Sequence, residues 1–370
     1  MAWRDTFLRH LGPGLLSGIA AGDWFRLLRD NRFAVTPSRL PKAVAITAQS
    51  LQNSLVGAYE RWRFGARVNE TVIRPPLFLL GHWRHGTTHL HNLFVADDRF
   101  AFPNNYEAFF PHTFLATEAV AIRPVAFFLP KRRPMDNVEW DMQSPQEDEF
   151  ALNIASGVSP CMGWMFPARR EYYDRYLTME DATAEEVARW KAALVLFLKK
   201  LTWKYGRPLV LKSPPHTGRI RLLLELFPDA KFVHIRRDPY AVFASTRHTL
   251  SVNGELNRLQ RPRTESADDW VLGQYAKMYG AFFREWRQIP AENRVEIGYE
   301  QLEIDPAGQL RRVYEALRLP DFGHAEPAIR RYVDSIAGYR KNSFPELPAD
   351  LRGRIARAWR PSFEAWGYPE

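Results

Sequence analysis

The apolar positions in the N-terminal part of the chain recur with the period of an α-helix. Between residues 40 and 64 they lie three or four residues apart, at Leu40, Val44, Ala48, Leu51, Leu55 and Tyr59. This spacing places them on one face and predicts a long amphipathic helix. Because no recognisable site occurs before residue 71, we interpret residues 1–70 as a helical N-terminal extension.

Further along, short apolar runs alternate with helical patterns. Four strands are predicted at residues 77–80, 208–212, 231–235 and, more weakly, 295–297, and helices are predicted at 86–94, 218–226, 239–249 and 306–317. Longer helices fit residues 185–205 and 267–287. Uninterrupted apolar runs are typical of strands that are covered on both faces. Repeated strand–helix units therefore predict an α/β fold, with a central parallel sheet flanked by helices, over residues 71–370.

Composition narrows the functions that this fold could serve. The 370 residues include 51 Lys and Arg against 42 Asp and Glu, a net charge of +9 with a pI near 9.6. The hydrophobic fraction of 46% excludes a disordered chain. One cysteine, Cys161, excludes a disulfide framework and a Cys-rich zinc site, and it favours a cytoplasmic location. We expect no membrane span, because the longest candidate, residues 11–21, is too short. With no long block of Lys and Arg, we expect no nucleic-acid partner, although an anionic ligand fits the charge.

The loop after the first predicted strand has the layout of a phosphate-binding loop. It reads GHWRHGTT over residues 81–88, between a strand and a helix. Glycines allow successive N–H groups to face one anion, and the helix N-terminus adds donors and a favourable dipole. Gly81 and Gly86 match the spacing of the nucleoside-triphosphate motif GxxxxGK[ST], but Thr87 replaces its lysine. Arg84 supplies a cation within the loop instead, which argues against ordinary ATP or GTP chemistry.

A second anion-binding pattern follows the third predicted strand. Arg237 ends this strand, and Asp238 and Pro239 begin a helix as N-cap and first residue. Ser245 follows eight residues after Arg237, within about two helical turns. An arginine offers a bidentate fork to a phosphate. Two such loops on neighbouring strands could hold two separated phosphates of one nucleotide.

Together, GxxRxGTT and R[DN]PxxxxxS make the chain resemble the sulfotransferases that use 3′-phosphoadenosine-5′-phosphosulfate (PAPS), in particular the bacterial members. The resemblance covers roughly residues 78–340 and implies a P-loop NTPase-like three-layer fold. It implies a PAPS donor whose 5′-phosphosulfate is bound by the first loop and whose 3′-phosphate is bound by the second. Carried over by position, the 5′ site comprises Arg84, Gly86, Thr87 and Thr88, and the 3′ site comprises Arg237 and Ser245, with Arg340 and Lys341 as a closing basic loop. His85 stands where the family commonly has Ser or Thr, and we include it among the donor-binding residues.

Sulfuryl transfer requires a base and cations near the transferred group. Arg84 and Lys212, at the end of the second predicted strand, are the candidate cations. Glu107 is the candidate base, since many sulfotransferases place a catalytic glutamate at about this interval after the loop, and His112 is the alternative. No metal is expected. Helical insertions at about 105–205 would form the acceptor site, and the acceptor could be a small molecule, a glycan or a lipid.

A local capping motif and two alternative functions are also compatible with the sequence. A capping box is predicted at residues 144–147, where Ser144 would be the N-cap and Glu147 the N3 residue.

For the chain as a whole, the alternative functions are a P-loop-like nucleotide kinase and a non-catalytic nucleotide-binding module. The missing loop lysine argues against the first, and the clustering of candidate base and cations near strand ends argues against the second.

Overall fold

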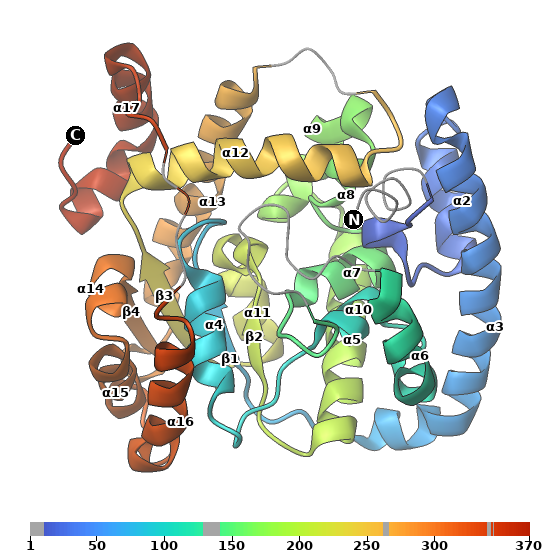
Figure 1. Ribbon diagram of the computed structural model, residues 1–370, viewed down its shortest axis with the longest axis horizontal. Helices are drawn as coiled ribbons and strands as arrows, with labels where there is room; N and C mark the ends of the chain where they lie inside the picture. The colour runs from blue at the N-terminus through green and yellow to red at the C-terminus, as the bar shows by residue number, and fades with distance from the viewer. Residues whose placement is uncertain (1–10, 129–140, 262–265, 339–341, 343) are drawn as a thin grey trace. The chain divides into compact units, whose positions relative to one another are not determined.

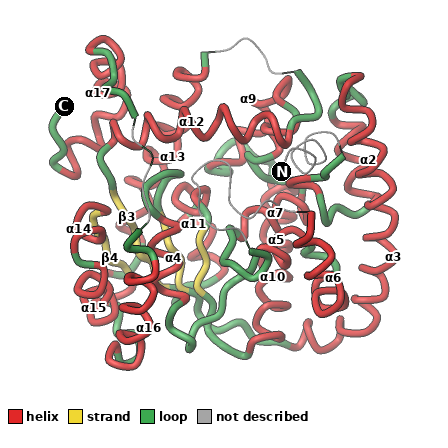
Figure 2. Tube along the Cα trace, in the orientation of Figure 1, coloured by secondary structure: helices red, strands yellow, loops and turns green. Residues whose placement is uncertain are grey.

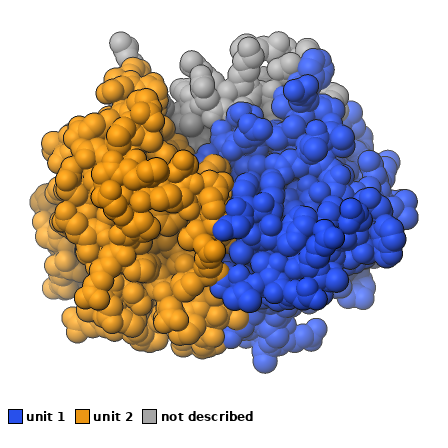
Figure 3. Space-filling view, turned by 90° about the horizontal axis from the view of Figure 1, so that it is seen from below, with its two compact units in different colours: residues 1–73, 103–206, 250–264 blue, residues 74–102, 207–249, 265–370 orange. Residues whose placement is uncertain are grey.

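The computed structural model describes residues 11–128, 141–261, 266–338, 342 and 344–370 (Figure 1). The contacts between Cα atoms divide the chain into two compact units (Figure 3). Unit 1 comprises residues 1–73, 103–206 and 250–264, and unit 2 comprises residues 74–102, 207–249 and 265–370. The chain therefore passes back and forth between the two units, and each unit is built from segments that are distant in sequence.

Unit 2 contains a four-stranded sheet (Figure 2). Its strands are β1 (Leu77–Leu80), β2 (Val210–Lys212), β3 (Lys231–Arg236) and β4 (Arg294–Gly298), in the order β2-β1-β3-β4. All neighbouring strands are parallel. The predicted α/β fold with a central parallel sheet is thereby confirmed. Because β1 lies between β2 and β3, the loop after β1 begins beside the carboxyl ends of two other strands.

Helices cover both faces of this sheet. On one face, Leu79 and Val233 belong to a hydrophobic core shared with α4 (Thr87–Val95), α15 (Pro306–Ala316) and α16 (Phe322–Ser335). The next residue of each strand faces the other side, where Phe78 packs on His216 and His234 packs on Phe282 of α13 (Ala267–Glu285). The helical elements of unit 2 are α4 (Thr87–Val95), the 3-10 helix η5 (Pro214–Gly218), α11 (Ile220–Leu226), the first part of α12 (Pro239–Asn257), α13 (Ala267–Glu285), α14 (Tyr299–Ile304), α15 (Pro306–Ala316), α16 (Phe322–Ser335) and α17 (Ala349–Trp366).

The regular elements in the described part of unit 1 are helices, joined by loops. Its helices are α2 (Ala21–Asp30), α3 (Leu40–Glu70), α5 (Asn105–Phe109), α6 (Phe114–Phe128), α7 (Asp148–Ser156), α8 (Met162–Met165), α9 (Arg170–Asp174) and α10 (Ala184–Tyr205). The long helix predicted from residue 40 is confirmed as α3, and the one predicted at 185–205 as α10. No helix in the described part of the chain combines the length and the apolar composition that a membrane span requires.

The apolar face of the amphipathic helix α3 points to solvent, whereas such a face is usually buried. All six apolar residues of its predicted face are exposed to solvent. The buried face instead combines the small or apolar residues Ala43, Ile46, Gly57 and Val68 with the polar residues Lys42, Ser50, Asn53 and Glu60. The polar residues are satisfied within unit 1: Asn53 donates to the carbonyls of Ser17 and Ile19 at 2.9 and 3.1 Å, and Glu60 pairs with Lys200. The polar side chains of α3 thus hold neighbouring segments by hydrogen bonds.

The predicted capping box at residues 144–147 is wrong. Helix α7 begins at Asp148, and its N-cap is Glu147, whose side chain makes no capping hydrogen bond. The amide of Gln146 instead donates to Asn105 Oδ1 at 2.5 Å. This tertiary contact, together with a hydrogen bond from the Gln146 N–H to the Pro103 carbonyl, holds residues 144–147 in an extended path against α5. Long-range pairing has therefore replaced the local cap.

Candidate active site

The loop from Gly81 to Gly86 joins β1 to α4 and has the backbone that the sequence pattern predicts. Gly81 has φ +151°, and its N–H donates to Thr217 Oγ1 at 2.8 Å. Gly86, the N-cap of α4, has φ +86°. A Cβ atom at Gly86 would lie 2.2 Å from the ring of Tyr299, so only glycine fits there. Within the described residues no side chain caps α4, which leaves its N-terminal donors available for an anion.

Arg84 connects the two predicted anion-binding loops. Its Nε donates to Ser245 Oγ at 2.8 Å, and its carbonyl accepts a hydrogen bond from Arg237 at 2.7 Å. Arg84 also has φ +71°, a left-handed conformation that is unfavourable for a residue with a Cβ atom. The guanidinium of Arg237 lies 4.1 Å from the centroid of the Tyr299 ring. The structure thus brings together Arg84, Arg237 and Ser245 in one hydrogen-bonded cluster that supports a strained loop.

A buried polar network lies beneath the loop, and its centre is the hydroxyl of Tyr279 on α13. This hydroxyl is 3.3 Å from the backbone N of His82, 3.2 Å from His85 Nδ1 and 3.2 Å from His234 Nε2. His234 Nδ1 is in turn 2.8 Å from Glu296 Oε2 on β4. All of these groups lie in unit 2, and the two loop histidines, His234 and Tyr279 are almost completely buried.

The partners of each atom define one consistent arrangement of protons in this network. Because Glu296 can only accept when ionised, His234 carries its proton on Nδ1, and its Nε2 accepts from the Tyr279 hydroxyl. His85 Nδ1 donates to the Ile235 carbonyl at 3.1 Å and also faces the Tyr279 oxygen. The Tyr279 oxygen then accepts from the His82 N–H. Each of these contacts is made with His234 and His85 protonated on Nδ1, whereas Nε2 of His82 and Nε2 of His85 have no hydrogen-bond partner among the described residues.

Burial fixes the protonation of the loop histidines. It lowers the pKa of His82 to about 4, and the hydrogen bond to the Trp83 carbonyl only partly opposes this shift. Burial, together with the neighbouring His82 and His234, lowers the pKa of His85 well below its ordinary value. Burial would raise the pKa of Glu296, but the hydrogen bond from His234 and the charge of Arg236 outweigh it, so the net shift is downward. Neutral His82 and His85 and an ionised Glu296 agree with the proton arrangement above.

Three of the predicted donor-site residues differ in how far they are exposed. Thr87 is buried in the first turn of α4, Thr88 beside it is half-buried, and the His85 ring is completely buried. The His85 ring therefore supports the loop from the interior, while its backbone belongs to the loop. The predicted closing residues Arg340 and Lys341 lie outside the described residues.

Lys212 is the last residue of β2, as predicted, and is buried. Its backbone is in register with Leu79 of β1, two residues before Gly81. The candidate cation therefore belongs to the same edge of the sheet as the Gly81–Gly86 loop. Ligands of open parallel sheets bind at this carboxyl edge.

The candidate base Glu107 lies in unit 1 and is fully buried. Its Oε2 accepts from the Asn104 N–H at 2.7 Å, which completes a capping box of α5. Its Oε1 accepts from Lys204 at 2.7 Å and from the Tyr205 hydroxyl at 2.8 Å. Burial raises the pKa of Glu107, although the charge of Lys204 opposes this shift. Glu107 thus has the full structural role of a helix-start glutamate as well as the raised pKa expected of a base.

The alternative base, His112, is also in unit 1 and follows α5. Its ring is half-buried, and Nε2 has no hydrogen-bond partner among the described residues. Burial lowers the pKa of His112 to about 4, helped by the charges of Lys200 and Arg61. His112 is therefore neutral at physiological pH and able to accept a proton, but its basicity is low.

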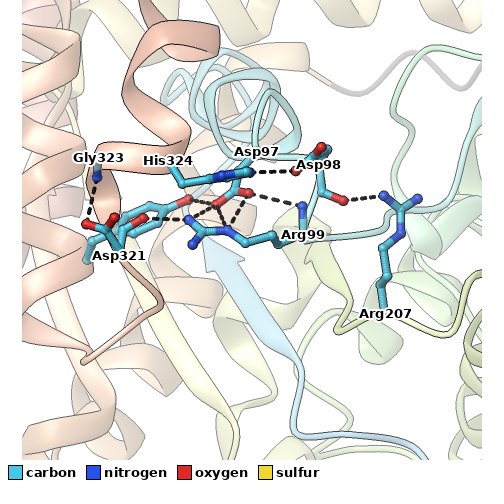
Figure 4. A network of polar contacts seen from close by, with 8 residues as sticks. Asp97, Asp98, Arg99, Arg207, Asp321, Gly323 and His324 are labelled. Carbon is cyan, nitrogen blue, oxygen red and sulfur yellow. Dashed lines mark hydrogen bonds and ion pairs between the residues drawn. The ribbon is translucent and has the colours of Figure 1, made fainter.

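The described residues contain one group whose atoms are close enough to share a metal ion, and its contacts indicate a structural role. The ligand atoms of Asp97, Asp98 and His324 lie within 4.8 Å of one another. However, Arg99 donates to both oxygens of Asp97 (Figure 4). The Tyr314 hydroxyl donates a further hydrogen bond to Asp97 at 2.9 Å. Since its carboxylate is already neutralised, Asp97 serves to join the end of α4 to α15.

Comparison with known proteins identifies relatives of the whole chain. The family model described as the sulfotransferase family matches residues 75–323. The chain is 40% identical over 361 residues to the omega-hydroxy-beta-dihydromenaquinone-9 sulfotransferase Stf3 of Mycobacterium bovis and of Mycobacterium tuberculosis. These alignments cover 97% of the chain and 92% of the relative.

Solved structures support the fold independently. The sulfotransferase STF9 from Mycobacterium avium matches with a TM-score of 0.72 at 19% identity, covering 94% of this chain and 97% of the other. STF1 from Mycobacterium tuberculosis matches with a TM-score of 0.67 at 17% identity, covering 92% of both chains. At such low identity the likeness concerns the fold, and it extends over nearly the whole length of each protein.

Proposed function

The chain belongs to the sulfotransferase family, and we propose that it moves the sulfuryl group of PAPS to a hydroxyl of a menaquinone-type lipid. One observation carries the donor assignment: Arg84, Arg237 and Ser245 are joined by hydrogen bonds beside the uncapped N-terminus of α4. Two cations and a helix N-terminus together suit a nucleotide with two separate phosphate groups. The lipid acceptor is inferred from the 40% identical relative, whose name specifies an omega-hydroxylated dihydromenaquinone.

The proposed reaction is an in-line displacement. A bond forms between the acceptor oxygen and sulfur while the bond from sulfur to the bridging phosphate oxygen breaks. The acceptor proton passes to a base, and adenosine 3′,5′-bisphosphate leaves with the developing negative charge. In this proposal Arg84, Lys212 and the N-terminus of α4, including Thr87 and Thr88, stabilise that charge, and no metal is required. Arg237 and Ser245 hold the 3′-phosphate, with Arg340 and Lys341 proposed to close over it.

The acceptor and the donor are tested together by a product assay. The purified protein is incubated with PAPS and either an omega-hydroxylated menaquinone or the same menaquinone without the hydroxyl. We expect a sulfated lipid and adenosine 3′,5′-bisphosphate from the first acceptor alone. The acceptor assignment is refuted if only other acceptors are sulfated. Phosphate transfer from ATP would instead support a kinase, and nucleotide binding without transfer to a broad panel of acceptors would support a binding module.

The base is assigned by comparing two variants. If Glu107 is the base, Glu107→Gln should lower turnover at saturating acceptor by about 10² or more, while the affinity for adenosine 3′,5′-bisphosphate stays unchanged. Because Glu107 also caps α5 and pairs with Lys204, thermal stability is measured in parallel. Lower stability with normal turnover would limit Glu107 to its structural role. In that case His112→Asn should abolish turnover.

A further inference from the structure

The outward face of α3 is a continuous apolar surface. At about 100° per residue, Leu40, Val44, Ala48, Leu51, Leu55, Ala58, Tyr59, Trp62 and Ala66 fall within an arc of about 100°. All nine are exposed, with 67% of Val44, 76% of Leu55 and 79% of Trp62 accessible to solvent. We call these nine residues the α3 stripe. It contains no charged residue and extends for about 39 Å along the helix.

Such a surface is unusual for a protein in water. Single exposed apolar residues are ordinary, but a contiguous apolar patch marks a binding surface. The orientation of α3 is fixed by its inward face, because Asn53, Ser54 and Glu60 on that side have specific hydrogen-bond partners within unit 1. A rotation of the helix that buried the stripe would break all of these contacts. The apolar side is therefore held outward by the packing of the polar side.

The charges around the α3 stripe indicate what covers it. Arg61 and Arg63 flank the stripe on either side, Arg67 follows one turn later, and all three are exposed. The only acidic residue between Leu40 and Val68 is Glu60, which is buried and paired with Lys200. Two copies of α3 pairing through their stripes would bring cations together without acidic partners, unlike the complementary flanks of a coiled coil. An anionic surface would instead pair with all three arginines.

We propose that α3 docks the protein on the surface of an anionic phospholipid bilayer through the α3 stripe. A helix lying in the plane of the membrane buries its apolar face at the boundary between head groups and acyl chains. Tyr59 and Trp62 suit this boundary because their rings are apolar while their polar atoms reach water. The flanking arginines then contact lipid phosphates. The proposal is independent of the acceptor assignment, although a membrane-bound enzyme could meet a lipid acceptor without extracting it into water.

Vesicle flotation with the full chain tests the proposal. The vesicles contain phosphatidylglycerol and phosphatidylcholine, or phosphatidylcholine alone, and they contain no quinone, so the result does not depend on the proposed reaction. We expect the protein to float with the anionic vesicles, and the bound fraction to fall with added salt. The double variant Leu55→Gln/Trp62→Gln should bind at least about tenfold more weakly. Arg61→Gln/Arg63→Gln should lose about tenfold on anionic vesicles.

Ile304→Gln provides the matched control, because it replaces an 85% exposed apolar side chain in unit 2. It should bind vesicles like the unmodified protein. Affinity for adenosine 3′,5′-bisphosphate, measured for each variant, shows that the fold is intact. The proposal is overturned if the unmodified protein does not bind anionic vesicles, or if the stripe variant binds equally well. It is also overturned if sedimentation shows a dimer that Leu55→Gln/Trp62→Gln converts to a monomer, since a second copy would then cover the stripe.

Discussion

The Tyr279 hydroxyl offers a direct test of how the interior supports the loop between β1 and α4. Tyr279→Phe removes one oxygen and leaves the buried ring in place. The substitution deprives the His82 N–H and His234 Nε2 of a partner, whereas His85 keeps its hydrogen bond to the Ile235 carbonyl at 3.1 Å. Two buried polar groups are therefore left unsatisfied.

The size of the effect follows from those two groups. A buried donor or acceptor without a partner costs about 1–3 kcal/mol. Both lost contacts are long, at 3.3 and 3.2 Å, which favours the lower half of that range. We expect a total destabilisation of about 2–4 kcal/mol, with about 1.4 kcal/mol falling on the His82 backbone and hence on the loop. A loss of about 1.4 kcal/mol corresponds to about tenfold weaker binding of adenosine 3′,5′-bisphosphate.

Calorimetric titration with adenosine 3′,5′-bisphosphate and a thermal melt together separate the possible outcomes. The matched control is Tyr275→Phe, the same change one turn earlier on α13, at a buried hydroxyl that has no hydrogen bond to the loop among the described residues. Tyr275→Phe should leave nucleotide affinity within about twofold of the unmodified protein, since it breaks no loop contact. If Tyr279→Phe lowers stability but leaves affinity unchanged, the network is purely structural and our reasoning is refuted.

Three further predictions concern the same region. Gly86→Ala should weaken nucleotide binding at least about tenfold, because the new methyl group meets the Tyr299 ring in a left-handed backbone, and isothermal titration would reveal this loss. Arg84→Lys keeps the charge but loses the planar Nε donor to Ser245, so steady-state kinetics should show kcat/KM falling by about 10². Glu296 has a lowered pKa, so its contribution to stability is present above the ordinary value of 4.5 and is lost as the pH falls through its folded-state pKa. Denaturant melts should accordingly show that the unmodified protein is more stable than Glu296→Gln near pH 7, and that this advantage shrinks in acid.

The parts of the fold that depend on local pattern could be predicted from the sequence. The fully buried strands β1 and β2 are predicted by their apolar runs, since a parallel strand in the middle of a sheet is covered on both faces, whereas the partly buried β4 gives a weaker pattern. The two anion-binding loops were visible because glycine spacing and a strand-ending arginine are local features. Their proximity followed from the general rule that the carboxyl ends of parallel strands lie at one edge. The hydrogen bonds of Arg84 to both Ser245 and Arg237 are consistent with that rule.

The support beneath the loop could not be predicted in the same way. Tyr279 lies 194 residues after His85, on a helix whose pattern gives no indication of which aromatic side chain reaches the loop. His234 lies inside the third predicted strand with nothing to mark it as a site residue, and its neighbour Glu296 lies in the weakest predicted strand. Pairing within the sheet makes these residues neighbours, because His234 is in register with Glu296. The network is thus a consequence of strand order, which periodicity alone does not contain.

Helix α3 shows that hydrophobic periodicity predicts the helical conformation but not which face of the helix is buried. The period predicts a helix, because apolar residues at three- and four-residue spacing share one face only in that conformation. Which face is buried depends on a comparison of free energies between the apolar stripe and the polar residues opposite. In unit 1 the polar residues of α3 make hydrogen bonds to loop carbonyls and an ion pair with Lys200. Leaving one buried polar group without a partner costs about as much free energy as leaving one leucine side chain exposed to water. A helix with such a polar face is held firmly even though its apolar face is outside, and that apolar face then remains available for a nonaqueous surface.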